Sequence, residues 1–493
     1  MAKKKTKKPA DPHGEFRGQR TEADQERRIV IDDAARTPTV LYLGSGIFWL
    51  LVGSLFGIVA SLKFNLPDWL GSSAALTFGR IRPAHLNTVM YGWASLAGAG
   101  MIVWLTARLC RIQLQLAWVH YLAVILWNLG VLAGTVAILA GYNQGMEWLE
   151  FPRFAGAMIA VGFLLFAASI IQTFRKRNVD HLYVSLWYIL ASMIWFPFLY
   201  VVANLGIYQG VIQAAMNWWY GHNALATWFT PIGLAGAYYF IPKVIGRPIY
   251  SYYLGLLGFW AFALFYNWNG IHHLVGGPLP TWLVTVSIVA SVMMVVPVMA
   301  VAVNHHLTTV NHFRMLKFSP TLRFVVIGSM CYTAVSVQGS LESIRSFQEV
   351  AHFTHYTIGH AHLGVYAFLS MILFGAIYYI MPRLARWEWP YPGLIKAHFW
   401  MSTAGIGIYV IALTIGGWFQ GVQLNDPAIP FMDVVEYTKI YLWARSIGGA
   451  LMVVSHFIFA FQFVMIIKHA GPRRFAPALF RESAPMQREE REP

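Results

Sequence analysis

The stretch that decides the fold is residues 357–382, TIGHAHLGVYAFLSMILFGAIYYIMP, which starts with two histidines within six residues and holds no Asp, Glu, Lys or Arg. A helix crosses roughly 30 Å of hydrocarbon with about 20 residues, and lipid tolerates only elements that pair every backbone group. Similar stretches recur along the chain. The sequence predicts about twelve spans, near 39–62, 85–107, 116–141, 154–174, 182–205, 218–242, 251–271, 281–304, 322–341, 357–382, 396–418 and 438–467. The predicted fold class is therefore all-α, a polytopic membrane bundle.

Composition excludes several classes of protein. Of 493 residues, 57% are hydrophobic and 12% are charged, and that charged share is about half the roughly 25% of soluble domains. The two cysteines, Cys110 and Cys331, lie far apart in the sequence. They exclude a disulfide framework, a Cys-based zinc site, an iron-sulfur cluster and a covalently attached c-type haem, which needs Cys-x-x-Cys-His. Any redox centre must be held by other residues.

The charge distribution predicts three parts of the chain. The net charge is +15, and five lysines lie within residues 1–8. No apolar periodicity precedes about Thr37, so we expect residues 1–37 to form a disordered basic tail in the cytoplasm. Such a tail touches anionic lipid at most, and nucleic acid is not an expected partner. Residues 38–470 are expected to form the twelve-helix transmembrane domain, and residues 471–493 a cytoplasmic C-terminal tail.

The loops predict the orientation of the bundle. Alternate loops carry most of the Lys and Arg residues: Arg108 and Arg111; Arg175, Lys176 and Arg177; Lys243 and Arg247; Arg314, Lys317 and Arg323; Arg383 and Arg386; Lys468, Arg473 and Arg474. Because basic loops face the cytoplasm, both termini are expected there, which requires an even number of helices. No Asp or Glu occurs between residues 181 and 341, so the middle helices act without a carboxylate.

Six of the 17 histidines stand out, because ionisable residues inside a membrane are functional candidates by default. With the predicted orientation, six histidines on four helices converge at one depth in the outer third of the membrane: His85, His222, His272, His273, His360 and His362. A lone histidine in a membrane is more often a packing residue, but six at one level favour ligands. Histidines expected at the surface are His13 in the tail and His305, His306 and His312 in a cytoplasmic loop.

Spacing assigns these histidines to different centres. His360 and His362 are two residues apart, so a helix turns them about 200° from each other, as suits a helix wedged between two planar cofactors. Imidazole binds iron and copper, and haem iron takes axial histidine. His362 with His85 would hold a six-coordinate, low-spin haem. His360 alone would hold a five-coordinate haem with one open face.

The other three histidines are expected to bind an ion at that open face. Gly270 lets the helix end, so that the adjacent rings of His272 and His273 turn to one ion together with His222. Three neutral imidazoles with a free position describe copper better than structural zinc. Tyr266 lies six residues before His272, about 9 Å lower on the same helix, where either a packing or a redox role is open to it.

Together these residues resemble the haem-copper oxidases, and within them the catalytic subunit I of the C family, the cbb₃-type cytochrome c oxidases. The resemblance covers residues 38–470. Four segments carry it: Arg-Pro-Ala-His at 82–85, Tyr-Gly-His-Asn at 220–223, Tyr-Asn-Trp-Asn-Gly-Ile-His-His at 266–273 and Thr-Ile-Gly-His-Ala-His at 357–362. It implies the catalytic subunit of a terminal respiratory oxidase in the bacterial inner membrane, which reduces O₂ to water with proton uptake.

The resemblance also implies residue roles. His85 and His362 are implied to bind a low-spin haem b, His360 a high-spin haem b, and the remaining three histidines copper. Tyr266 matches a tyrosine that family members cross-link to the copper ligand here numbered His222, and it is implied to supply an electron and a proton. Electrons are implied to arrive from membrane-anchored c-type cytochrome subunits.

Further roles implied by the resemblance concern charge and protons. Arg445 is expected to pair with a haem propionate, and Glu147 and Glu150 resemble an acidic stretch near a calcium ion. Three hydroxyl residues are candidates for a cytoplasmic proton route, with packing as the alternative role: Thr230, Tyr238 and Tyr252.

One departure keeps an alternative open. Where the C family is expected to have a glutamate, about 22 residues before the proximal histidine, this chain has Gln338, with Glu342 one turn later. That puts the usual proton route in doubt. The alternative is a nitric oxide reductase, which would need glutamates beside a non-haem iron and would lack Tyr266. A twelve-helix secondary transporter would explain the spans but not six histidines at one depth.

Overall fold

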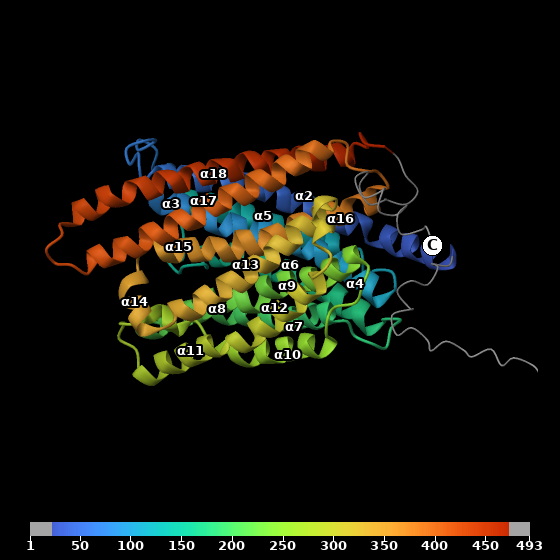
Figure 1. The fold of residues 1–493 in the computed structure, drawn as a ribbon, viewed down its shortest axis with the longest axis horizontal. Coiled ribbons are helices and arrows are strands. Elements are labelled where there is room, and N and C mark those ends of the chain that lie inside the picture. The colour runs from blue at the N-terminus through green and yellow to red at the C-terminus, as the bar shows by residue number, and fades with distance from the viewer. Residues whose placement is uncertain (1–21, 473–493) are drawn as a thin grey trace, which may run out of the picture.

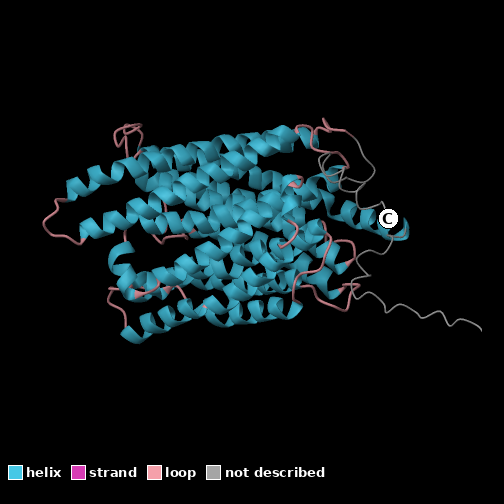
Figure 2. Cartoon of the chain, in the orientation of Figure 1, coloured by secondary structure: helices cyan, strands magenta, loops and turns pink. Residues whose placement is uncertain are grey.

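The computed structural model describes residues 22–472, and every regular element in this range is helical (Figure 2). The predicted all-α class is confirmed. The helices run side by side along the length of an elongated bundle (Figure 1). The α-helices are α2 (Glu22–Leu62), α3 (Phe78–Asn87), α4 (Ser95–Cys110), α5 (Val119–Ala140), α6 (Arg153–Arg175), α7 (Val184–Asn204), α8 (Gly210–Ala224), α9 (Thr230–Ile245), α10 (Tyr252–Phe265), α11 (Thr281–Met293), α12 (Val295–Thr309), α13 (Pro320–Glu342), α14 (Arg345–Ala351), α15 (His355–His362), α16 (Met371–Ala385), α17 (Pro392–Leu424) and α18 (Phe431–Ile467). The 3₁₀ segments are η1 (Ala74–Leu76), η4 (Tyr266–Trp268), η5 (Ile271–Leu274) and η6 (Phe313–Lys317), and the π segments are η2 (Thr88–Ala94), η3 (Leu225–Phe229) and η7 (Leu363–Ser370).

Within residues 22–472, eleven helices are long and apolar enough to cross a membrane, one fewer than the twelve predicted. The difference lies at the predicted span 251–271. There α10 stops at Phe265, and η4 and a break at Asn269 and Gly270 follow. α10 packs against α12 in the bundle (Figure 1), so it is a shorter twelfth helix. It is short because the chain turns away before His272 and His273.

The first helix starts earlier than its apolar pattern predicts. α2 begins at Glu22, so the predicted boundary at residue 37 is wrong for the described part of the tail. Asp32 accepts a hydrogen bond from Trp104 Nε1 at 2.9 Å and pairs with Arg108 at 3.3 Å, and Asp33 pairs with Arg386 at 2.6 Å. These contacts with other parts of the bundle stabilise the polar first turns of α2, which hydropathy alone does not predict. Residues 1–21 and 473–493, with most of both predicted tails, lie outside the described residues.

A π segment lies directly after a candidate ligand in three continuous rods. Segment η2 follows His85 between α3 and α4, η3 follows His222 between α8 and α9, and η7 follows His362 between α15 and α16. A π turn takes in an extra residue, which rotates the helix before it relative to the helix after it, and such turns are frequent at functional sites. The orientation of the helix that carries each candidate ligand is therefore not fixed by the orientation of the buried helix that continues the rod.

Two serines close these π segments in the same way. Ser95 Oγ donates to the carbonyl five residues back at 2.7 Å and accepts from Trp228 Nε1 at 3.0 Å. Ser370 Oγ also donates to the carbonyl five residues back, at 2.9 Å, and accepts from Trp93 Nε1 at 2.9 Å. An indole of one ligand-bearing rod therefore bonds to a serine that closes the π segment of another rod.

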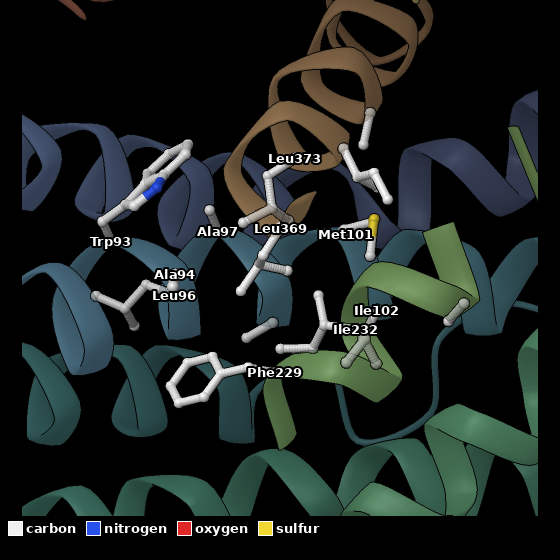
Figure 3. Packing of buried hydrophobic residues seen from close by; sticks show 14 of the residues in the cluster. Trp93, Ala94, Leu96, Ala97, Met101, Ile102, Phe229, Ile232, Leu369 and Leu373 are labelled. Atoms are coloured by element: carbon white, nitrogen blue, oxygen red, sulfur yellow. The ribbon is translucent and has the colours of Figure 1, made fainter. Parts of the chain in front are cut away.

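The three rods meet in an apolar core. Figure 3 shows Trp93 and Met101 from the first rod, Phe229 and Ile232 from the second, and Leu369 from the third around one contact region. Each of these side chains is at most 2% exposed. Interiors packed this tightly do not deform freely, so the core fixes the positions of the candidate ligands at the ends of the rods.

Candidate metal and cofactor centre

Three histidines form a compact group at the end of the bundle's central rods. His222 lies in α8, and His272 and His273 lie in η5. One ring nitrogen from each lies within 4.8 Å of the others, the one such group of three His, Cys, Asp or Glu side chains in residues 22–472. Because metal–nitrogen bonds are about 2 Å long, nitrogens this close can share one ion after small side-chain rotations. The predicted convergence of these three residues is therefore present in the fold.

The backbone at Gly270 makes this convergence possible. Its φ of +106° is one that residues with a side chain rarely adopt. A Cβ atom at this position would lie 2.6 Å from the carbonyl oxygen of Trp218 and 3.1 Å from Cβ of His222. Only glycine therefore allows the chain to leave η4 and pass this close to α8. The α-helix ends earlier than predicted, at Phe265, and Gly270 makes the turn that follows η4.

The partners of each imidazole indicate which nitrogen is available. His272 Nδ1 is 2.9 Å from Ser291 Oγ, and that hydroxyl donates to the carbonyl of Ser287 at 2.8 Å. The ring therefore donates from Nδ1 and keeps the lone pair of Nε2. His222 Nδ1 is buried and has no hydrogen-bond partner among the described residues. An orphaned ring nitrogen beside two other imidazoles fits a metal ligand, because buried polar atoms otherwise find partners.

Tyr266 lies beside this group. Its ring centroid is 5.0 Å from that of His222 and 4.9 Å from that of Phe262. The side chain of Thr230 lies next to it. η4 and η5 both pack against α8, which carries His222, so the phenol and the imidazoles of His272 and His273 lie near the same side chain. A continuous helix would hold Tyr266 and His272 about 9 Å apart along its axis.

His85 and His362 face each other as a nearly parallel pair. Their ring centroids are 6.4 Å apart and their planes differ by 9°. His85 Nδ1 donates to the carbonyl of Gly53 at 2.7 Å, and His362 Nδ1 to that of Ile358 at 2.9 Å. Carbonyls only accept, so Nε2 of each ring is the unprotonated nitrogen. With metal–nitrogen bonds of about 2 Å on either side, an ion between the rings would separate their centres by about 6 Å. The pair fits axial ligation of one haem iron.

His360 faces away from this pair, as its two-residue spacing from His362 predicts. Its Nδ1 is 3.3 Å from Gln338 Oε1 on α13, and the ring is close enough to interact electrostatically with all three histidines of the compact group. The side chain is 24% exposed although it lies between packed helices, and Glu342 Oε2 is 3.7 Å from its Nε2. Because the Gln338 amide oxygen only accepts, Nδ1 carries the proton and Nε2 keeps its lone pair, which fits a single histidine ligand of a five-coordinate haem.

Arg445 is buried in α18 at 5% exposure. Its Nε donates to Ser61 Oγ at 3.0 Å, and its guanidinium lies over the ring of Phe64 at 4.6 Å. No ion pair joins it to a carboxylate of residues 22–472. A buried charge without a partner of opposite sign is costly, so this site fits an anionic group such as a haem propionate.

The acidic pair does not fit a calcium ion. Arg82 forms ion pairs with both Glu147 and Glu150, and Asn87 donates to Glu150 at 2.8 Å. Calcium takes about six to eight oxygen ligands, whereas here a guanidinium already compensates the two carboxylates. Burial raises the pKa of Glu150 to about 7, although Asn87 and Arg82 act to lower it.

Two histidines of the predicted cytoplasmic loop, His305 and His306, lie in α12 instead. His305 belongs to α12, which continues to Thr309, and is 2% exposed, so the prediction of a loop residue is wrong. Its Nδ1 is 2.8 Å from Ser329 Oγ, and its ring is 4.4 Å from that of Tyr238. The prediction failed because a run of two histidines and a following threonine pair gives no apolar signal, while hydrogen bonds to neighbouring helices keep the turn buried.

The three hydroxyl residues named for a proton route differ in their surroundings. Tyr238 and Thr230 are buried in α9, at 0% and 8% exposure. Tyr238 contacts His305, and Thr230 lies next to Tyr266. Tyr252 instead donates to the carbonyl of Leu182 at 2.6 Å, which ties the start of α10 to the loop before α7. Its position supports the packing role.

Sequence analysis missed several residues that hold the candidate ligands. Trp218 stacks on His273 with centroids 4.3 Å apart, and Tyr409 OH is 3.3 Å from His362 Nε2. Ser287 and Ser291 support His272. The serines gave one usable signal, since their spacing of four places them on one face of a helix. Trp218 and Tyr409 gave none among so many aromatic residues.

Comparisons with known proteins agree with this geometry. A family model described as Cytochrome C and Quinol oxidase polypeptide I matches residues 37–451. The chain is 30% identical to a cytochrome c oxidase subunit 1 homolog of Agrobacterium tumefaciens, over 85% of this chain and 81% of that protein. It is 29% identical to the cbb3-type cytochrome c oxidase subunit CcoN1 of Stutzerimonas stutzeri, over 88% and 95% of the two chains.

Two further similarities are weaker. A nitric oxide reductase chain of Stutzerimonas stutzeri is 25% identical over 84% of this chain and 91% of that protein. A solved chain of a haem-copper terminal oxidase dimer superposes with a TM-score of 0.67 at 16% identity, covering 92% of this chain and 86% of the other. The latter likeness shows a shared fold.

Proposed function

Because this chain belongs to the cytochrome c and quinol oxidase polypeptide I family, we propose that its histidine centre is the oxygen-reducing site of a haem-copper oxidase. The chain is the catalytic subunit of a terminal respiratory oxidase, a polytopic membrane protein of the cytochrome c oxidase type. The observation that carries the proposal is the compact group of His222, His272 and His273 facing His360. Haem and copper are the cofactors of this family.

We assign the residues as follows. His85 and His362 hold a low-spin haem b through Nε2, with their Nδ1 protons fixed by backbone carbonyls. His360 holds a high-spin haem b, with Gln338 as the acceptor for its Nδ1 proton. The three grouped histidines hold copper. Such second partners fix the tautomer and orientation of each ligand.

The iron and copper held by these histidines would supply the binding of O₂ and the electrons for its reduction, and the protein supplies geometry and protons. Tyr266 stands next to His222, where its phenol can donate a proton and an electron to the site. Phe262 packs against the phenol ring and helps to hold it beside His222. Thr230 lies next to Tyr266, and the buried Tyr238 follows about two helical turns further along α9. A positioned proton donor of this kind contributes about 10²- to 10⁴-fold to a rate.

The nitric oxide reductase alternative is disfavoured by the same geometry. That reaction centre would need carboxylates beside the non-haem metal, and residues 181–341 contain none. Within the described residues the compact group consists of imidazoles alone. Glu342 does lie near His360, but it is not a member of the group formed by the three histidines.

Elemental and haem analysis of the purified complex tests the proposal. One copper per two haems b, with His222→Ala losing the copper and keeping both haems, is the expected result. His85→Ala should lose the low-spin haem and keep the copper. Iron in excess of haem, or copper retained in the His222→Ala variant, would contradict the assignment.

Oxidases of this family consist of several subunits, and we propose membrane-anchored c-type cytochromes as the electron donors to this chain. The chain holds no Cys-x-x-Cys-His segment and two widely separated cysteines, so it cannot attach a c-type haem itself. We also propose the bacterial inner membrane as its location, with both termini in the cytoplasm.

A further inference from the structure

A buried triad of Ser54, His456 and Tyr366 lies next to the proposed low-spin haem ligands. His456 Nδ1 is 2.8 Å from Ser54 Oγ, and His456 Nε2 is 2.9 Å from Tyr366 OH. The three side chains come from α2, α18 and η7 and are 3–8% exposed. None of the assigned cofactor roles uses them.

The direction of each hydrogen bond in the triad follows from the partners. Ser54 Oγ donates its one proton to the carbonyl of Leu50 at 2.5 Å, so it can only accept from His456. His456 is therefore protonated at Nδ1, and its Nε2 accepts from Tyr366 OH. The imidazole is neutral and held on both sides, which fixes the orientation of its ring.

The triad connects the two segments that position the proposed haem ligands His85 and His362. Ser54 follows Gly53, whose carbonyl holds His85 Nδ1 at 2.7 Å. Tyr366 lies four residues after His362, about one helical turn along the same rod. One imidazole therefore ties the α2 backbone that orients His85 to the rod that carries His362.

The packing at α2 makes that backbone position critical. Gly57 lies against the His85 ring, and a Cβ atom there would come 2.7 Å from His85 Cε1. α2 thus supports the ring of His85 from Gly53 to Gly57, with Ser54 between them as the anchor to α18. A shift of this segment would change both the hydrogen bond to Nδ1 and the tilt of the ring.

We propose that His456 is a positioning residue for the electron-transfer haem, holding the planes of His85 and His362 nearly parallel through Ser54 and Tyr366. This inference rests on the proposed function, because it requires that pair to bind a haem. Two consequences follow. The angle between the ligand planes governs the splitting of the iron d orbitals, and the Nδ1–H···O=C bond of His85 governs how strongly that ring donates electrons.

The test is electron paramagnetic resonance and a redox titration of the purified complex, comparing the unaltered protein with His456→Leu and Tyr366→Phe. We expect His456→Leu to move the g-values of the low-spin ferric haem from the parallel-plane type toward the perpendicular-plane type. Its midpoint potential should rise, because a loosened hydrogen bond leaves His85 a weaker donor to ferric iron. Copper content and the high-spin haem should not change. Tyr366→Phe, which removes one hydroxyl, should shift both quantities in the same direction by less.

His120 offers a matched control, because it is also a buried imidazole between a tyrosine and a serine. Its nitrogens are 3.3 Å from Tyr42 OH and 2.8 Å from Ser169 Oγ, on α2 and α6. His120→Leu should lower thermal stability and leave the low-spin g-values unchanged. Unchanged g-values and potential in His456→Leu would overturn the inference, and Tyr366→Phe decides if that variant does not assemble. Absence of a bis-histidine low-spin signal in the unaltered protein would overturn the proposed function itself.

Discussion

The candidate ligand histidines differ in the hydrogen-bond partner of Nδ1. The proposed haem ligands place Nδ1 on an acceptor, which is the carbonyl of Gly53 for His85 and the amide oxygen of Gln338 for His360. His222 differs, because its buried Nδ1 has no partner among the described residues. In His85 and His360 the unprotonated nitrogen is therefore Nε2 before any metal binds.

Tyr266 carries the first prediction. Tyr266→Phe keeps the packing against Phe262 and His222 but removes the hydroxyl, so the site loses its nearest proton donor. We expect O₂ consumption to fall by at least about 100-fold, the lower range for a positioned acid. Copper and haem contents should stay at the levels of the unaltered protein. An oxygen electrode and metal analysis on the same preparation measure both, and undiminished turnover would show that Tyr266 is a packing residue.

Glu150 carries a prediction on pH. Burial raises its pKa from the ordinary 4.5 to about 7, so between these values the folded state binds more protons than the unfolded state. Stability should therefore fall as pH rises through about 4.5 to 7 and level off above, by at most about 3 kcal/mol.

Thermal unfolding of the purified complex across this pH range measures the effect. Glu150→Gln should flatten the slope. Glu147→Gln is the matched control, because Glu147 pairs with the same Arg82 but is 36% exposed in its side chain. Equal slopes in the unaltered protein and Glu150→Gln would contradict the prediction.

Gly270 shows how one backbone position makes the copper site. Gly270→Ala would place a Cβ 2.6 Å from the Trp218 carbonyl at a φ of +106°, and unfavourable backbone conformations alone cost about 1–3 kcal/mol. We expect the variant to lose copper and keep both haems, as read by metal and haem analysis. Gly276→Ala distinguishes a steric clash of the Cβ atom from backbone strain. Gly276 also has a positive φ, +83°, but a Cβ atom there would have no neighbouring atom within 4 Å. It should retain copper. Copper loss in both variants, or in neither, would refute the argument.

At the scale of helices, the three π segments link ligand position to packing. Trp93→Phe removes the indole donor to Ser370 and leaves a buried hydroxyl with one partner fewer, at a cost of about 1–3 kcal/mol. We expect a lower midpoint of thermal unfolding and a shifted low-spin haem absorption band, because the bond joins the rods of His85 and His362. Trp400→Phe is the control, since Trp400 is 62% exposed on α17. If both variants behave alike, the indole bond has no such role.

The sequence predicted the helices well and their interruptions poorly. Hydropathy locates a span because its length and apolar content suffice, as in residues 357–382. The π segments are equally apolar and carry no signal, so η2, η3 and η7 could be seen only in three dimensions. Likewise the spacing of His360 and His362 predicted two faces of one helix, whereas the support of His272 by Ser291 depends on how α11 packs against η5. The local sequence pattern identifies the candidate ligands, whereas their hydrogen-bond partners depend on tertiary packing.

For the whole molecule, the polar groups divide between the two ends of the bundle. At one end Arg27 donates to the carbonyl of Arg111, Asp33 pairs with Arg386, and the backbone N–H of Asn178 donates to the carbonyl of Cys110. These contacts gather the loops that sequence analysis assigned to the cytoplasm. The proposed ligands, by contrast, lie towards the other end of the same rods, before η2, η3 and η7. Protons from the cytoplasm must therefore cross much of the bundle to reach Tyr266.

The orientation depends on whether the short α10 counts as a span, which reporter fusions can decide. If it does, the number of crossings is twelve, and alkaline phosphatase should be active when fused at Gly145 or Asp426 and inactive at Asn178 or Arg386. If α10 only enters and leaves one leaflet, every loop after it changes side, so Arg386 becomes active and Asp426 inactive while Gly145 and Asn178 stay as they are. We expect the first pattern, because the basic loops before and after α10 meet at one end of the bundle and positive loops stay on the cytoplasmic side. The second pattern would separate the two termini across the membrane and refute the twelve-helix arrangement.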